Sequence, residues 1–171
     1  VILQSRPLAQ PEEMDEQEED IAADLCGEDA LLGGGVTACR GAAFGPVHVV
    51  RSNVDLLEFP QGAVLVVESP LPEWASLMSR AIAVISDTGH AATHLAIVAR
   101  EFGVPAVFGA KGATRKLQKG SMVTVDATLR CVYPGRREEA LARAAPPPNM
   151  MADSPIYRIL QEITAHVLPL N

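Results

Sequence analysis

The chain has few aromatic residues, few cysteines and no long apolar run. Aromatic residues make up 4% of the sequence, so aliphatic residues must fill most of the core that a 48% hydrophobic content allows. The three cysteines, Cys26, Cys39 and Cys131, are odd in number and lack zinc-binding spacing, which favours reduced thiols in a cytoplasmic protein. The lack of a long apolar run and of a charged-then-apolar leader argues against a membrane span and a secretory signal.

The chain also lacks a basic stripe interleaved with aromatic residues, which argues against nucleic-acid binding. Its formal net charge of −7 comes from 21 acidic and 14 basic residues. Ten of the acids lie between Glu12 and Asp29, where there is no lysine or arginine. This stretch is typical of a solvated helical linker or a partly disordered one, with a binding role as the alternative.

The most informative stretch places a histidine where a glycine-containing loop turns into a helix. The pattern predicts a strand at 81–86, a helix that begins at His94 after the hydroxyl residue Thr93 and ends at Gly103, and a buried strand at 104–108. Free N–H groups and the helix dipole favour an anion at that position. A neutral imidazole, with a pKa of about 6.5, keeps a free lone pair at neutral pH. His94 is therefore a candidate phosphoryl carrier, and Thr93 would cap the helix or contact the phosphate.

This stretch resembles the mobile phosphohistidine domain of phosphoenolpyruvate (PEP)-utilising enzymes, among them PEP synthase, pyruvate phosphate dikinase and the rifampin phosphotransferases. The resemblance rests on Gly89, Thr93-His94 and the run Ala-Arg-Glu-x-Gly-x-Pro-Ala at 99–106. It implies an α/β fold of the swivelling β/β/α type, with a mixed sheet and flanking helices, and His94 as the phosphohistidine. It also suggests that Arg100 contacts a docking partner domain, although an intrahelical or tertiary ion pair is an equal alternative.

One position departs from the family pattern: His90 stands where relatives have a second glycine. We expect His90 to be a polar loop residue that screens the phosphate. Because His90 and His94 are four residues apart, a metal site is a second interpretation, but the sequence places no third ligand. His48 and His166 are interpreted as surface or partly satisfied side chains.

The remaining patterns predict an organisation around this domain. Residues 1–10 resemble the end of an ATP-grasp-like nucleotide-binding domain, in which Gln4 and Arg6 would lie beside the phosphates and metal; an ordinary edge strand is the alternative. An acidic linker or helix at 11–32, the phosphohistidine domain at 33–134 and a helical linker at 135–171 complete the chain. Because the first residue is not methionine, we expect a piece of a longer protein.

Within the domain, the patterns predict further secondary structure. The predicted elements are strands across 36–50 with a turn at Gly41, a buried strand at 62–68, a short helix at 73–79 with an apolar side of Trp74, Leu77 and Met78, a helical turn at 112–117, a hairpin of 121–126 with 129–133, an alanine-rich helix at 136–145 and an amphipathic segment at 156–168.

The resemblance implies a relay in a larger ATP-dependent enzyme. An ATP-binding domain would phosphorylate His94, the domain would swing on its linkers, and an acceptor-binding domain of the same polypeptide would receive the phosphoryl group. In synthase and dikinase relatives the acceptor is pyruvate. ATP and Mg²⁺ would belong to the parent enzyme, with no cofactor bound by this domain alone and no turnover in isolation. A degenerate docking domain that is never phosphorylated is the alternative.

Overall fold

The computed structural model describes residues 26, 27 and 29–144. The predictions for Gln4, Arg6, His166 and the segment 156–168 fall outside these residues. Among the described residues, no helix is both long and apolar enough to cross a membrane.

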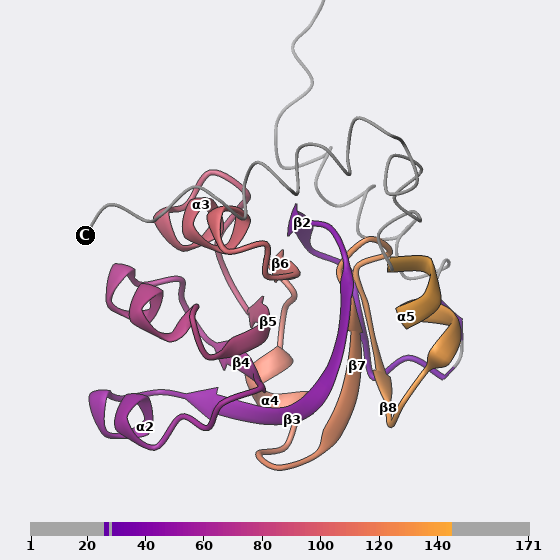
Figure 1. The fold of residues 1–171 in the computed structure, drawn as a ribbon, viewed down its shortest axis with the longest axis horizontal. Coiled ribbons are helices and arrows are strands. Elements are labelled where there is room, and N and C mark those ends of the chain that lie inside the picture. The colour runs from indigo at the N-terminus through magenta and orange to yellow at the C-terminus, as the bar shows by residue number, and fades with distance from the viewer. Residues whose placement is uncertain (1–25, 28, 145–171) are drawn as a thin grey trace, which may run out of the picture.

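The described residues form a mixed sheet with helices on its faces (Figure 1). The strands are joined in the order β1-β8-β7-β3-β4-β5-β6-β2, and β3 to β6 run parallel while the other pairings are antiparallel. This confirms the predicted α/β fold with a mixed sheet. The strands are β1 (Leu32–Gly33), β2 (Val36–Cys39), β3 (Ala42–Val50), β4 (Ala63–Val67), β5 (Ala81–Ser86), β6 (Ala106–Phe108), β7 (Met122–Asp126) and β8 (Cys131–Pro134). The helices are α2 (Asn53–Leu57), the 3₁₀ helix η1 (Pro72–Leu77), α3 (His94–Glu101), α4 (Ala113–Lys116) and α5 (Glu138–Ala144).

The long strand β3 belongs to both halves of the sheet. Its residues 42–46 pair antiparallel with β7, and its residues 47–50 pair parallel with β4. The change of partner follows Gly45, where an added Cβ would lie 2.5 Å from Ile82 Cδ1 and 2.8 Å from the Gly62 carbonyl oxygen. The close approach of neighbouring chain therefore requires glycine at this point.

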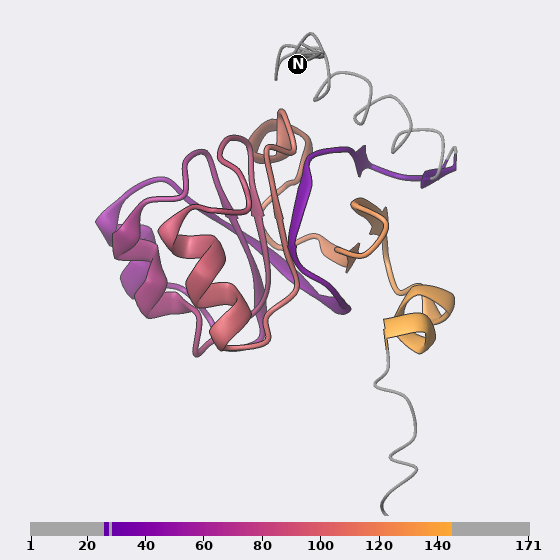
Figure 2. The ribbon, with the colours of Figure 1, turned by 90° about the horizontal axis from the view of Figure 1, so that it is seen from above.

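Two apolar clusters lie on opposite faces of the parallel strands. Alternate residues of β4 divide between them: Leu65 faces the cluster beneath α2, η1 and α3, while Val64 and Val66 face the cluster shared with β7 and α4. Figure 2 shows α2, η1 and α3 on one face of the sheet. All five residues of β4 are buried, as the continuous apolar run predicted.

Most predicted elements are confirmed, including the strands β4 to β6 and the β7–β8 hairpin. The helix predicted at 73–79 is the 3₁₀ helix η1, and its predicted apolar residues Trp74, Leu77 and Met78 are buried. The strands β2 and β3 flank Gly41 as predicted but do not pair with each other, since β2 pairs with β6. Outside the predicted range 33–134, α5 contacts β3 and β7 and buries Ala140.

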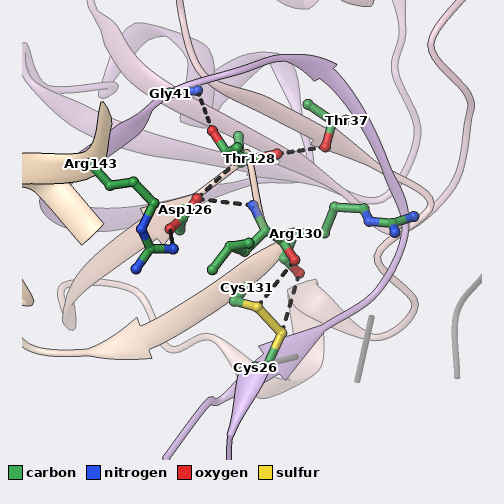
Figure 3. A network of polar contacts seen from close by, with 10 residues as sticks. Cys26, Thr37, Gly41, Asp126, Thr128, Arg130, Cys131 and Arg143 are labelled. Carbon is green, nitrogen blue, oxygen red and sulfur yellow. Dashed lines mark hydrogen bonds and ion pairs between the residues drawn. A yellow bond between two sulfur atoms is a disulfide. The ribbon is translucent and has the colours of Figure 1, made fainter. Parts of the chain in front are cut away.

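The expectation of reduced thiols was wrong: Cys26 and Cys131 form a disulfide (Figure 3), and Cys39 is free. Of the two interpretations of His48, the surface position is wrong and the partly satisfied side chain is confirmed. The residue is buried, it hydrogen-bonds the backbone of Asp55, and its ring packs edge-on against Phe59 with centroids 5.3 Å apart. Its Nε2 atom has no hydrogen-bond partner among the described residues. Burial, and to a smaller extent Lys119, lowers the pKa of His48 against the opposing influence of nearby acids.

Candidate functional site

His94 is the first residue of helix α3, as the sequence predicted. Thr93 precedes the helix in an extended conformation, and its carbonyl accepts the first helical hydrogen bond from Ile97 N–H at 3.1 Å. At the other end, Gly103 has a φ of +65°. The N–H of Gly103 bonds Arg100 O at 3.1 Å and that of Val104 bonds Ala99 O at 2.8 Å. These two bonds are the Schellman motif that ends many helices.

The His94 side chain is exposed, and the helix that carries it packs against the core. Leu95, Ala96 and Ala99 are fully buried in the cluster under η1 and α3. The imidazole makes no hydrogen bond within the described part of the chain, so neither ring nitrogen is engaged there. Leu95 and Ala96 are fully buried, so their amides are not open to solvent, while the positive end of the helix dipole favours an anion at this position.

Thr93 does not cap the helix with its side chain. Its hydroxyl instead donates to His90 O at 3.0 Å, and its N–H bonds the same carbonyl at 3.1 Å. The His90 ring accepts a hydrogen bond at Nδ1 from Ala92 N–H at 3.2 Å. These bonds close a turn over residues 90–93 immediately before His94.

The structure gives the metal interpretation no support. His90 and His94 are both exposed, but Nδ1 of His90 is engaged with the backbone. No group of three histidine, cysteine or acidic residues able to hold a metal ion is found in the described ranges. A zinc site needs at least three such protein ligands.

The start of the loop is held by an aspartate that links it to helix α4. The Asp87 carboxylate accepts hydrogen bonds from Thr114 N–H at 2.9 Å and from Thr114 Oγ1 at 2.5 Å. The Asp87 N–H bonds Val67 O at 3.0 Å, and Thr88 Oγ1 donates to Glu68 O at 2.9 Å. The loop therefore leaves β5 in a fixed direction.

Three glycines let separate chain segments approach each other beside this loop. Gly89 has a φ of +97°, and an added Cβ would lie 2.7 Å from Pro70 Cγ. A Cβ at Gly109 would lie 3.2 Å from the Gly89 carbonyl oxygen, and one at Gly35 would lie 2.6 Å from the Phe108 carbonyl oxygen. Each of the three has a positive φ, which only glycine adopts readily.

Arg100 makes contacts within the domain. Its Nε donates to Ala38 O in β2 at 3.0 Å, and its guanidinium also donates to Ala91 O in the turn before His94. Neither of the ion pairs considered from the sequence is formed among the described residues. Arg100 therefore joins the last turn of α3 to β2 and to the loop.

Apolar side chains are exposed on α3 and beside the loop. Ile97, one turn further along α3, is 44% exposed. Leu71 is also 44% exposed, and it follows Pro70, which lies against Gly89. No local sequence signal pointed to Pro70 or Thr114, because each reaches the loop from a distant part of the chain.

Comparison with known proteins agrees with the resemblance seen in the sequence. Residues 59–129, which include the whole loop and α3, match the family model described as PEP-utilising enzyme, mobile domain. The chain is 39% identical over 156 residues to a probable phosphoenolpyruvate synthase of Archaeoglobus fulgidus, covering 91% of this chain and 20% of that protein.

Two further relatives agree with this. Identity to a phosphoenolpyruvate synthase of Aeropyrum pernix is 37% over 147 residues, covering 84% of this chain and 18% of the relative. Identity to an uncharacterized phosphotransferase, YvkC of Bacillus subtilis, is 45% over 92 residues, covering 54% of this chain and 11% of the relative. The chain thus spans a fifth or less of the length of these curated relatives.

Proposed function

Because this chain belongs to the PEP-utilising enzyme family as a mobile domain, we propose that it carries a phosphoryl group on His94 from ATP to a second substrate within a larger enzyme. The observation that carries the proposal is an exposed imidazole at the start of a helix whose next residues are buried. Pyruvate is the proposed acceptor, because several relatives are named as phosphoenolpyruvate synthases.

The proposed relay has two displacement steps. In the first, a ring nitrogen of His94 forms a bond to phosphorus while the P–O bond to the leaving group of ATP breaks, and the ring loses a proton. In the second, an acceptor oxygen forms a P–O bond while the P–N bond breaks. Both steps need an in-line approach, so the carrier nitrogen must be reachable from outside the domain.

We assign ATP, Mg²⁺ and the acceptor to partner domains of the same polypeptide. The described residues lack a three-ligand metal group, and the relatives are about five times longer than this chain. Gln4 and Arg6 would contact the nucleotide only in an intact ATP-binding domain. The cytoplasm is the proposed location, as expected of such metabolic enzymes.

The loop residues receive distinct roles in this proposal. Gly89 and His90 shape the turn that presents His94. The Thr93 hydroxyl donates its single hydrogen bond to His90 O. It can donate to the phosphate only if it rotates away from that carbonyl. Arg100 holds the loop, and its exposed guanidinium could contact a docked partner without losing its bond to Ala38 O.

Labelling the parent enzyme tests the proposal. The enzyme containing this chain is incubated with Mg²⁺ and ATP labelled with ³²P at the β or γ position. We expect an acid-labile, alkali-stable label in the wild type and in the matched control His90→Gln, and none in His94→Gln. Label that persists in His94→Gln, or a wild-type enzyme that binds ATP and takes up no label, overturns the assignment; the second result favours a docking domain.

A further inference from the structure

A surface pocket with three basic side chains lies between helix α4 and the end of strand β3. Its cavity has a volume of about 430 Å³, and Arg51, Arg115 and Lys119 line it. Asp55 is the one acidic residue among the described residues of the lining. None of these four residues belongs to the loop or the helix at 87–101, so the pocket is separate from His94.

The fold places this pocket at the carboxyl ends of the parallel strands. Arg51 directly follows β3, and the chain then enters α2, whose Leu56 packs on one face of the sheet. Helix α4 is followed by Leu117, and both Ala113 and Leu117 belong to the apolar cluster on the other face. In α/β sheets, ligands commonly bind outside the carboxyl ends of parallel strands, where flanking segments leave to opposite faces.

The charge of the pocket is opposite in sign to the net charge of the chain, which is −7. The stretch 102–125 contains no acidic residue, and its basic residues are Lys111, Arg115, Lys116 and Lys119. In the pocket, three positive side chains and one carboxylate leave a formal charge of +2. An organic phosphate monoester carries about −1.5 to −2 at pH 7, which matches this charge.

The basic side chains have donors that the domain does not use. The Arg115 guanidinium makes no hydrogen bond or ion pair with any described residue. Lys119 pairs with Glu58 at 3.6 Å, but the two side chains are 53% and 63% exposed, so the pair contributes little. Arg51 donates from Nη2 to Thr114 O at 3.4 Å, and a guanidinium has five N–H donors.

The carboxylate in the pocket is engaged with the backbone at the start of α2. Asp55 Oδ2 accepts hydrogen bonds from the N–H groups of Arg51 and Ser52, both at 3.0 Å, and from Ser52 Oγ at 2.9 Å. The bond from Arg51, together with those from Ser52, lowers the pKa of Asp55, so this side chain stays ionised at neutral pH. Its charge therefore opposes anion binding without neutralising a basic group by direct pairing.

We propose that this pocket binds the phosphate group of a small organic phosphate. Arg51, Arg115 and Lys119 would donate charge-assisted hydrogen bonds to the phosphate oxygens. The apolar side chains of Val49 and Leu117, which also line the pocket, would contact the rest of the molecule. The cavity volume lies within the range of about 300–1,000 Å³ that is typical of small-ligand sites. The proposal does not depend on phosphoryl transfer at His94.

The first experiment uses two probes that differ only in the phosphate. The ¹⁵N-labelled 171-residue chain is titrated with adenosine 5′-monophosphate (AMP) or with adenosine at constant ionic strength, and its amide resonances are followed. We expect AMP to cause saturable shifts at Arg51 and at residues 114–119, and adenosine to cause none. Inorganic phosphate should shift the same amides with several-fold lower affinity. No saturable shift at these amides with AMP, or equal binding of adenosine, overturns the proposal, and equal binding of inorganic phosphate overturns the assignment of an organic ligand.

Charge variants then locate the site. Arg115→Gln and Lys119→Gln should each weaken AMP binding at least about fivefold, the effect of one unit charge at contact distance in water. Lys116→Gln is the matched control, because Lys116 is exposed on the same helix and does not line the pocket. It should change the affinity less than about twofold, because salt screens charges outside the site. An equal loss in Lys116→Gln, or full affinity in the double variant Arg115→Gln/Lys119→Gln, overturns the proposal.

Two further variants test the sign of the charge effect and the separation from His94. Asp55→Asn removes the opposing charge but keeps an oxygen that can accept the bonds at the start of α2, so AMP should bind about fivefold more tightly. Unchanged or weaker binding in this variant counts against the proposal. His94→Gln should bind AMP as the wild type does, and a loss there would place the probe at the start of α3 instead. Since no step uses the parent enzyme, failure of the carrier function leaves these results unaffected.

Discussion

Replacing Gly89 with alanine should destabilise the domain more than the same change at Gly120. Both glycines have strongly positive φ values, +97° and +88°, so each variant carries a backbone cost of about 1–2 kcal/mol. At Gly120 the new Cβ meets no atom within 4 Å. At Gly89 it would lie 2.7 Å from Pro70 Cγ and 3.2 Å from Cδ, well inside the ordinary carbon contact of about 3.5–4.0 Å.

The difference between the two variants isolates the steric part of the cost. Proline is a closed ring that cannot rotate away, so the loop or η1 must shift, at about 1–3 kcal/mol beyond the backbone cost. We therefore expect Gly89→Ala to lower the free energy of unfolding by about 2–5 kcal/mol and Gly120→Ala by about 1–2 kcal/mol, measured by urea denaturation. Because the displaced loop carries His94, labelling of the parent enzyme should also slow in Gly89→Ala alone.

A double-mutant cycle decides whether the clash is responsible. Pro70→Ala removes Cγ and Cδ, so the combination Pro70→Ala/Gly89→Ala should cost less than the sum of the single variants by about 1 kcal/mol or more. Strict additivity, or equal losses in Gly89→Ala and Gly120→Ala, would refute the reasoning about this contact.

Three other predictions concern more distant features. In oxidising buffer, Cys26→Ser should lower the free energy of unfolding by about 2–5 kcal/mol because the bond joins residues 105 apart, and the loss should vanish under reducing conditions; a loss that persists there points to packing instead. Because burial lowers the folded pKa of His48, the unfolded chain binds more protons between that value and its ordinary pKa of about 6.5, so stability should fall as pH drops below about 6.5. His48→Leu should flatten this part of a urea-denaturation pH profile, and an unchanged slope counts against the assignment. Thr114→Val leaves Asp87 without its hydroxyl donor and should cost about 1–3 kcal/mol in the same assay, with no change expected if water replaces the bond.

Local pattern was sufficient for the elements that surround His94. The continuous apolar run at 63–67 predicted a fully buried strand, and helical spacing with a closing glycine predicted both ends of α3. These signals are local because burial on both faces and helix termination depend on neighbouring residues in sequence.

Features that depend on contacts between residues far apart in the sequence could not be predicted from local pattern. The disulfide joins residues that no spacing rule relates, and β2 pairs with β6 because Gly35 fits closely against Phe108 and Gly109. The side-chain partner of Thr93 was also missed, since a hydroxyl before a helix can bond either forward to the helix or backward to the loop. His48 lies in β3, none of whose residues is exposed, and Phe59 and α2 pack against that strand from later in the chain.

The division of β3 between two partners has a consequence for how the domain tumbles. A continuous strand crosses from one half of the sheet to the other, and an apolar cluster fills the space between β4 and β7. Bending the halves against each other would break that strand and open the cluster. Backbone amides in β5 and β8 should therefore report the same rotational correlation time in nuclear relaxation experiments, and any large reorientation of His94 must come from motion of the entire body.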